Sequence, residues 1–248
     1  MTAKRALVTG GIGGIGSAIC EELAQKGCHV IAAHHPAEAE AAKARLSAWQ
    51  GMALPAGAGF SLCAVDVTSF DSCREMAAQT GPIDILVNCA GITRDKTLRK
   101  MQPEEWHAVI DVDLSSLFNV TKQYIDAMTD SGFGRIVNIS SVNGKKGQFG
   151  QTNYSAAKAG VHGFTMALAQ EVARKGVTVN SVSPGYVETA MPKAIPAEIS
   201  AAIVAQIPLG RMAQPAEIAH AVAFLADART GYITGVNLSI NGGLFTSF

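Results

Sequence analysis

The sequence predicts an α/β fold, a doubly wound parallel sheet of about seven strands with helices on both of its faces. Short apolar runs alternate with longer helix-compatible segments along the 248 residues, an order that is typical of repeated strand–helix–strand units. The first apolar run leads directly into a glycine-rich stretch at residues 10–16, and a helix-compatible segment follows. No break in composition divides the chain, so we expect one domain over residues 1–248.

The composition limits the classes of function. Hydrophobic residues make up 48% of the chain and charged residues 16%, which indicates a well-buried globular core. A formal net charge of zero argues against a general nucleic-acid or anionic-membrane surface. Because no signal peptide and no bilayer-spanning apolar segment is present, we expect a cytoplasmic enzyme. The five cysteines lack a C-x-x-C pair and the six histidines lack ligand spacing, so we expect reduced thiols and no metal site.

The first unit of the chain predicts a nucleotide-binding turn. We expect a strand at Ala6–Thr9 and a helix at Ser17–Lys26, with the glycine-rich stretch between them. Glycines allow a tight turn and a close backbone approach to a pyrophosphate, which then lies at the positive end of the helix. The turn residues assigned to the cofactor are Gly10, Gly11, Ile12, Gly14, Ile15 and Gly16.

The end of the second strand bears on the choice of cofactor. A carboxylate at this place would bind the adenosine ribose hydroxyls of NAD, but the expected strand Cys28–Ala33 is followed by His34 and His35. Without that acid, and with Lys43 and Arg45 nearby, the sequence favours NADP(H) and leaves NAD(H) possible. Both basic residues are equally explained as the solvated face of a helix.

The remaining elements follow the same alternation. Further strands are expected at Phe60–Val65, Ile83–Val87, Gly134–Ile139, Val177–Val182 and Ile233–Ile240. Helices are expected at Ala37–Gln50, from Pro103 to about Asp130, from Asn153 to about Lys175, at Glu198–Gln206 and at Pro215–Ala226.

Polar and small residues follow several of these strands at the edge where doubly wound sheets bind ligands. Asp66 follows the third strand, where it either accepts from the adenine amino group or belongs to the cap of the next helix. Asn88, Ala90 and Gly91 form another small-residue turn, which we assign to the cofactor site. Ser141 follows the central strand and is placed at the same edge.

Tyr154 and Lys158 lie one helical turn apart, so a helix would put them on one face. A phenol is a poor base at neutral pH, and a fixed cation nearby favours its ionised form. Such a tyrosine can donate and accept a proton. The alternative is an ordinary half-buried tyrosine beside a solvated lysine, which is the more frequent meaning of an isolated Tyr-x-x-x-Lys.

Three further segments are candidates for a substrate site. The segment Thr93–Lys100 gathers four basic residues around Asp95, although a solvated surface is the usual explanation of such a run. The loop Val142–Thr152 contains Gln148, Phe149 and Gln151 as candidate pocket residues. The loop Pro184–Pro196 contains three prolines and is interpreted as a substrate lid.

These motifs together resemble the short-chain dehydrogenase/reductase family, over essentially the whole chain. The residues that carry the resemblance are Thr9-Gly10-x-x-x-Gly14-Ile15-Gly16, Asn88-x-Ala90-Gly91, Ser141, Tyr154-x-x-x-Lys158 and Pro184-Gly185. The resemblance implies a Rossmann-like fold and hydride transfer from a nicotinamide cofactor to a carbonyl carbon. It makes Tyr154 the general acid, Ser141 a hydrogen-bond donor to the same oxygen, and Lys158 a partner of both tyrosine and nicotinamide ribose. It assigns the nicotinamide wall to Pro184, Gly185, Val187 and Thr189.

The runs at residues 91–95, 140–144 and 148–154 resemble more narrowly the acetoacetyl-CoA reductases of polyhydroxybutyrate synthesis. This resemblance implies NADPH-dependent reduction of acetoacetyl-CoA to (R)-3-hydroxybutanoyl-CoA. It places Asp95, Lys100, Ser141, Gln148, Phe149, Gln151, Tyr154 and Tyr186 in the substrate pocket. The basic segment would then attract the phosphates of coenzyme A. The resemblance also implies a homotetramer, with the helices from Pro103 and Asn153 in one interface and the C-terminal strand in another.

Two residues depart from the family pattern. Asp113 stands where the family has an asparagine that holds a water of the proton relay, and we count it among the catalytic residues. An aspartate accepts but does not donate unless protonated, and its charge raises the pKa of a nearby lysine. We hypothesise that water still occupies the site and that the enzyme is active. Cys89 replaces the second asparagine of Asn-Asn-Ala-Gly, which we interpret as a tolerated packing change.

Two other functions compete with this interpretation. A 3-oxoacyl-acyl-carrier-protein reductase would share the fold, the catalytic residues and the cofactor. The segment Thr129–Gly132, just before the central strand, lacks the basic residues expected to contact an acidic carrier. Arg174 and Lys175 remain as candidates for carrier binding. A non-catalytic dinucleotide sensor on the same fold is the third possibility, and the three catalytic residues argue against it.

Overall fold

The computed structural model describes residues 3–189 and 197–246 and is built around one seven-stranded sheet. The strands lie in the order β3-β2-β1-β4-β5-β6-β7, and every neighbouring pair is parallel. They span Arg5–Thr9 (β1), His29–His34 (β2), Gly59–Ala64 (β3), Ile85–Asn88 (β4), Gly134–Ile139 (β5), Val177–Pro184 (β6) and Asn237–Ile240 (β7). The predicted α/β fold class with a doubly wound sheet is confirmed.

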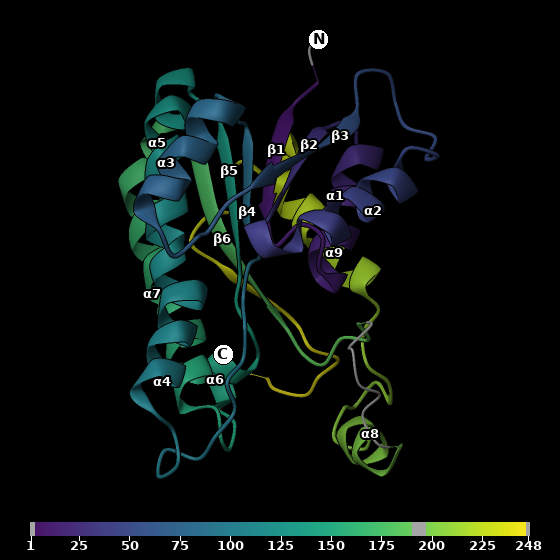
Figure 1. Ribbon diagram of the computed structural model, residues 1–248, viewed down its shortest axis with the longest axis vertical. Helices are drawn as coiled ribbons and strands as arrows, with labels where there is room; N and C mark the ends of the chain where they lie inside the picture. Colours follow the sequence, from purple (N-terminus) through teal and green to yellow (C-terminus); the bar gives the residue numbers. More distant parts are fainter. Residues whose placement is uncertain (1–2, 190–196, 247–248) are drawn as a thin grey trace.

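Helices cover both faces of the sheet (Figure 1). One layer contains α3, α4, α5 and α7, and the other contains α1, α2 and α9. The helices span Gly14–Gln25 (α1), Ala39–Trp49 (α2), Phe70–Thr80 (α3), Pro103–Ile110 (α4), Ser116–Ser131 (α5), Asn143–Lys146 (α6), Thr152–Val172 (α7), Ala197–Val204 (α8) and Pro215–Ala226 (α9).

Each face of the sheet has its own apolar core, because successive side chains of a strand point to opposite faces. Val8 and Val30 belong to the core under α1 and α9, whereas Leu7 and Ile31 belong to the core under α3, α5 and α7. Strands that are buried on both faces read as continuous apolar runs, which is why the sequence marks them clearly.

The strand order reverses at β1, whose neighbours are β2 on one side and β4 on the other. A ligand site is expected at this switch point, outside the carboxyl ends of the strands. Thr9 Oγ1 joins the turns after the two strands by accepting from the backbone N–H groups of Cys89 and Ala90 at 3.0 and 3.1 Å. Gly10 has a φ of +63°, and a Cβ there would lie 3.0 Å from the Ala90 Cα, so the position requires glycine.

The helix predicted from Pro103 to Asp130 is interrupted. The α-helices α4 and α5 are separated by a π-helical segment at Asp111–Ser115. Segments of this kind are uncommon and are often found at functional sites. The apolar pattern continues through the segment, so the sequence shows no sign of the change in helical pitch.

Other elements also differ from the prediction. The last strand is half as long as expected, because Gly235 adopts a φ of +74° and the strand begins only at Asn237. The helix α1 begins three residues before the predicted Ser17, within the glycine stretch. The loop predicted at Val142–Thr152 contains the short helix α6.

Residues 190–196 of the predicted substrate lid lie outside the described residues. Over the two described ranges, none of the helices combines the length and apolar character that crossing a membrane requires.

Candidate active site

Tyr154 and Lys158 lie on one face of α7, as their spacing predicts. The Lys158 Nζ atom is 5.6 Å from the centroid of the Tyr154 ring. Lys158 is buried, with 4% of its surface exposed, so the alternative of a solvated lysine is wrong. A buried ammonium needs partners that offset its loss of hydration.

The ammonium of Lys158 has two such partners. It donates to the carbonyl of Ile139, the last residue of β5, at 3.1 Å, and it pairs with Asp113 Oδ2 at 3.2 Å. Burial lowers the pKa of Lys158, but the charges of Asp113 and Tyr154 outweigh this effect and hold the pKa above its usual range. The lysine is therefore held as a cation beneath the tyrosine ring.

Asp113 reaches this place from the π-helical segment, where it is completely buried. Its Oδ1 accepts from the backbone N–H of Ile92 at 2.8 Å. Burial raises the pKa of the Asp113 carboxyl, and Lys158 and the Ile92 N–H oppose the shift. A Cβ at Gly91 would lie 3.0 Å from Asp113 Oδ2 and 3.3 Å from Lys158 Nζ, so the small residue leaves room for the ion pair. Asp113 thus contacts Lys158 directly, and its charge acts to raise the pKa of the lysine, as the sequence predicts.

Ser141 follows β5 at the same edge of the sheet and is buried. Its Oγ accepts from the backbone N–H of Asn143 at 3.1 Å, which leaves the hydroxyl proton to be donated elsewhere. The neighbouring Ser140 donates to the Lys158 carbonyl at 2.8 Å. A Cβ at Gly144 would lie 2.7 Å from the Lys158 carbonyl carbon, so the turn after β5 packs closely on α7. These contacts bring Ser141 to the helix that carries Tyr154 and Lys158.

The amino end of α1 has the features of an anion site. Its N-cap is Gly13, which supplies no side-chain hydrogen bond, and the first turn contains no acidic residue. Gly13 and Gly14 are exposed. The backbone N–H groups at such a helix end attract a phosphate. A Cβ at Gly14 would lie 2.6 Å from Thr189 Cγ2, so the structure brings the predicted wall residue Thr189 beside the glycine turn.

The other predicted wall residues follow β6. Pro184 ends this strand, and its carbonyl accepts from the Val142 N–H at 2.9 Å. Gly185 lies against β7, where a Cβ would be 2.9 Å from the Asn241 Cα. Val187 forms an isolated parallel bridge with Ala213.

His34 and His35 differ in their surroundings at the end of β2. His34 is buried, and its Nδ1 lies 2.9 Å from the His35 carbonyl. His35 is exposed, and its Nδ1 accepts from the Ala37 N–H at 3.2 Å, so the ring carries a proton on Nε2 that it can donate outward. Lys43 pairs with Glu40 at 2.8 Å on the exposed face of α2, as the solvated-face alternative predicts.

The side chains of two predicted cofactor residues form hydrogen bonds with other groups of the protein. Asp66 Oδ1 accepts from the backbone N–H and the hydroxyl of Thr68, at 3.0 and 2.7 Å, and the N-cap of α3 is Ser69. The side chain of Asn88 donates to Thr121 Oγ1 at 3.3 Å and to Asn138 Oδ1 at 2.8 Å. The Asn88 side chain thus stabilises the interior between strand and helix.

The segments around residues 93–100 and 147–152 lie together, as a shared pocket requires. Lys96 N–H donates to the Gly150 carbonyl at 2.9 Å, and Gln151 Nε2 donates to Asp95 Oδ2 at 2.8 Å. Gln148 accepts from Lys146 Nζ at 2.8 Å. Lys100 is exposed, and Phe149 is 87% exposed. The structure therefore joins Asp95 to Gln151 and leaves Lys100 and Phe149 at the surface.

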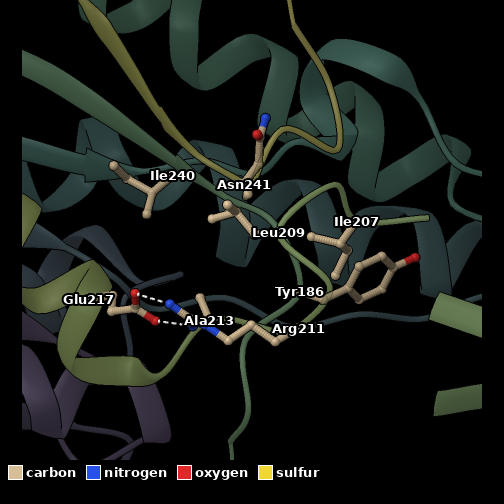
Figure 2. A pocket seen from close by; sticks show the side chains of 9 residues that line it. Tyr186, Ile207, Leu209, Arg211, Ala213, Glu217, Ile240 and Asn241 are labelled. Atoms are coloured by element: carbon tan, nitrogen blue, oxygen red, sulfur yellow. Dashed lines mark hydrogen bonds and ion pairs between the residues drawn. The ribbon is translucent and has the colours of Figure 1, made fainter. Parts of the chain in front are cut away.

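Tyr186 lines a small cavity beyond the end of β6 (Figure 2). Its ring extends beside Ile207, and the opposite side of the cavity holds the ion pair of Arg211 with Glu217, at 2.6 and 2.7 Å. Hydrogen bonds from Arg211 lower the pKa of Glu217 to about 2. This cavity is formed by residues 207–217 and the end of β7, so it is separate from the contacts between Asp95 and Gln151.

Sequence reasoning missed several groups of the site. The backbone groups Ile92 N–H and Ile139 carbonyl carry no sequence signal, and Asn143 lies in the run 140–144 that carries the resemblance but has no predicted role of its own. Burial raises the pKa of the Cys89 thiol to about 11, which is consistent with the predicted packing role.

A model of the family described as short chain dehydrogenase matches residues 4–200. The chain belongs to the short-chain dehydrogenase family. The acetoacetyl-CoA reductase of Allochromatium vinosum is 60% identical to it, over 98% of this chain and 99% of that protein. The acetoacetyl-CoA reductase of Cupriavidus necator is 53% identical over the same shares. The 3-oxoacyl-[acyl-carrier-protein] reductase of Haemophilus influenzae is 46% identical over the full length of both chains.

Membership of this family makes the protein an oxidoreductase and implies a nicotinamide dinucleotide cofactor. The exposed glycines and uncapped amino end of α1 fit the pyrophosphate of such a cofactor. Within the described ranges, no group of three or more His, Cys, Asp or Glu side chains is placed to hold a metal ion.

Proposed function

We propose that this protein reduces acetoacetyl-CoA to (R)-3-hydroxybutanoyl-CoA with NADPH and supplies polyhydroxybutyrate synthesis. The observation that carries the proposal is the identity of 60% to an acetoacetyl-CoA reductase over nearly the whole of both chains. The relative named as a carrier-protein reductase is less similar, at 46% identity. The catalytic side chains present at one edge of the sheet support a reductase rather than a non-catalytic sensor.

The catalytic roles are proposed from the family resemblance, and the contacts of Ser141 and Lys158 support them. Ser141 donates its hydroxyl proton to the ketone oxygen, while its Oγ accepts from the Asn143 N–H. Tyr154 delivers a proton to the alkoxide as general acid. The Lys158 ammonium beneath the ring favours the phenolate that remains, and Asp113 and the Ile139 carbonyl hold it there. The bound cofactor supplies the hydride.

The remaining cofactor residues are proposed from their places in the fold. The turn after β1 and the amino end of α1 hold the pyrophosphate, and the residues after β4 and β6 enclose the nicotinamide and its ribose. Asp66 and His35 lie at the adenosine end. Ala90 and Gly91 contribute backbone, since the Asn88 side chain is used inside the protein.

The substrate residues form the mouth of the proposed site. Arg94, Arg99 and Lys100 are exposed there, whereas Lys96 pairs with Glu105. Exposed cations attract the phosphates of coenzyme A and raise the rate of encounter. Phe149 offers exposed aromatic surface to the same ligand, whereas Tyr186 lines the separate cavity beyond β6.

A steady-state comparison of acetoacetyl-CoA with acetoacetyl-carrier protein tests the substrate. We expect kcat/KM to be higher for the coenzyme A thioester at low ionic strength, and the difference to shrink as salt screens the mouth. A higher kcat/KM for the carrier protein would assign the chain to fatty acid synthesis instead.

The preference for NADPH is expected to depend on His35. In His35→Asp, a carboxylate replaces the outward N–H donor and repels the extra phosphate of NADPH. We expect kcat/KM with NADPH to fall by about tenfold or more relative to NADH, a change of ~1.4 kcal/mol in relative transition-state stabilisation. His35→Asn introduces no negative charge and serves as the control. An unchanged ratio of the two cofactors in His35→Asp would remove His35 from the site.

Asp113→Asn is expected to leave an active enzyme with an altered pH profile. The asparagine carbonyl can still accept from the Ile92 N–H, but the charge that raises the pKa of Lys158 is lost. The alkaline limb of kcat, where the ammonium is lost, should therefore move to lower pH. The pH dependence of kcat, measured from about pH 6 to about pH 11, checks this shift. An inactive wild type that Asp113→Asn restores to activity would contradict the role given to Asp113.

A homotetrameric, cytoplasmic enzyme is part of the same proposal. Phe118 on α5 and Met166 on α7 are 56% and 51% exposed, which supports an interface over these helices. Phe224 and Tyr232 are likewise exposed near β7. Sedimentation of the purified protein checks the oligomeric state.

A further inference from the structure

Asn143 connects the candidate catalytic serine with two residues of the proposed thioester pocket. Its backbone N–H donates to Ser141 Oγ at 3.1 Å, and its Nδ2 donates to Gln151 Oε1 at 2.9 Å. Gln151 Nε2 in turn donates to Asp95 Oδ2 at 2.8 Å. The four residues form a continuous hydrogen-bonded chain from the buried Ser141 to the exposed Asp95.

The carboxylate at the outer end determines the direction of these bonds. A carboxylate oxygen only accepts, so Gln151 turns its NH₂ group toward Asp95 and its carbonyl toward Asn143. Asn143 then presents its own NH₂ group to Gln151. The reverse orientation of both amides would place the Gln151 carbonyl against the carboxylate.

This arrangement leaves Asn143 Oδ1 buried, with no donor among the described residues. A buried acceptor without a partner destabilises a fold, and an apolar side chain of similar size would avoid that cost. The contact with Ser141 comes from the backbone, so it does not require asparagine. What the asparagine side chain adds is the bond that orients Gln151.

We propose that Asn143 is a positioning residue that determines specificity for the coenzyme A thioester. Its side-chain amide fixes the positions of Gln151 and Asp95 relative to Ser141. A thioester bound at the mouth then presents its ketone oxygen to the Ser141 hydroxyl. The inference rests on the proposed function. A small β-keto ester does not reach the mouth, and its reduction depends only on Ser141, Tyr154 and Lys158.

Asn143→Leu tests this role with two substrates, acetoacetyl-CoA and ethyl acetoacetate. We expect kcat/KM for acetoacetyl-CoA to fall about tenfold, because Gln151 loses the bond that orients it. The value for ethyl acetoacetate should stay within about twofold, and the Tm should be unchanged or higher because the unpaired acceptor is gone.

Thr178→Val is the matched control. Thr178 Oγ1 is also buried without a partner, but it lies at the amino end of β6, at the opposite edge of the sheet. This variant should keep both rates. If Asn143→Leu does not fold, Asn143→Ala is measured by the same criteria.

An equal loss on both substrates, or no loss on acetoacetyl-CoA, would overturn the role of Asn143. A wild-type enzyme that reduces ethyl acetoacetate as efficiently as acetoacetyl-CoA would overturn the proposed function, and the role of Asn143 with it. The wild-type comparison therefore distinguishes the two failures.

Discussion

Tyr154→Phe is expected to lower kcat for acetoacetyl-CoA about 10³-fold, because the general acid is removed while the ring remains. The phenylalanine keeps the packing on α7, and Lys158 keeps its bonds to Asp113 and the Ile139 carbonyl. We therefore expect the Kd of NADPH, measured by fluorescence titration, to change by less than about threefold (~0.7 kcal/mol).

The control for this variant is Tyr124→Phe. Tyr124 is buried, and its hydroxyl pairs with Thr80 at 2.9 Å. Thr80 is also bonded by Arg5, the first residue of β1, so this pair lies at the amino edge of the sheet. Loss of the Tyr124 hydroxyl should lower the free energy of unfolding by about 1 kcal/mol and leave kcat unchanged. A Tyr154→Phe enzyme with more than a tenth of the wild-type kcat would show that another group protonates the alkoxide.

Lys158→Met is expected to abolish turnover and to destabilise the fold. The methionine removes the cation that favours the phenolate, and it leaves the Asp113 carboxylate buried without its partner. Removing one member of a buried ion pair lowers the free energy of unfolding by about 3–5 kcal/mol. Chemical denaturation at neutral pH measures this loss.

The double variant Asp113→Asn/Lys158→Met separates the two effects. It removes the unpaired charge, so most of the lost stability should return while the enzyme stays inactive. A Lys158→Met protein as stable as the wild type would contradict the buried ion pair.

The contribution of the ion pair to stability also has a defined pH dependence. Because the pKa of Lys158 in the fold lies above its usual value of 10.5, its stabilising contribution is complete below that value and is lost as the pH rises through the folded-state pKa.

Features determined by local chemistry were predictable from the sequence. The buried parallel strands appear as apolar runs, and Gly10 marks a turn whose φ of +63° favours glycine. Tyr154 and Lys158 meet because helical spacing brings them together. These patterns were sufficient for the fold class, the glycine turn and the catalytic helix.

Features that depend on long-range packing were not predictable in the same way. Asp113 reaches Lys158 from a π-helical segment, which the apolar pattern does not distinguish from α-helix. Gln151 and Asp95 are 56 residues apart, and their bond follows only from the packing of two loops. Asn88 lies in a small-residue turn that is typical of a cofactor site. Its side chain, however, donates hydrogen bonds to the neighbouring strand β5 and helix α5. In each case the contribution of the side chain depends on which distant residue it contacts in the fold, and the sequence does not show that contact.

The initial rate of acetoacetyl-CoA reduction, measured with NADPH and NADH in parallel, tests the central claim most directly. The proposed function predicts rapid oxidation of NADPH that depends on acetoacetyl-CoA, slower oxidation of NADH, and (R)-3-hydroxybutanoyl-CoA as the product on chiral analysis. Absence of acetoacetyl-CoA-dependent oxidation with both cofactors, from a protein that still binds NADPH, would contradict it.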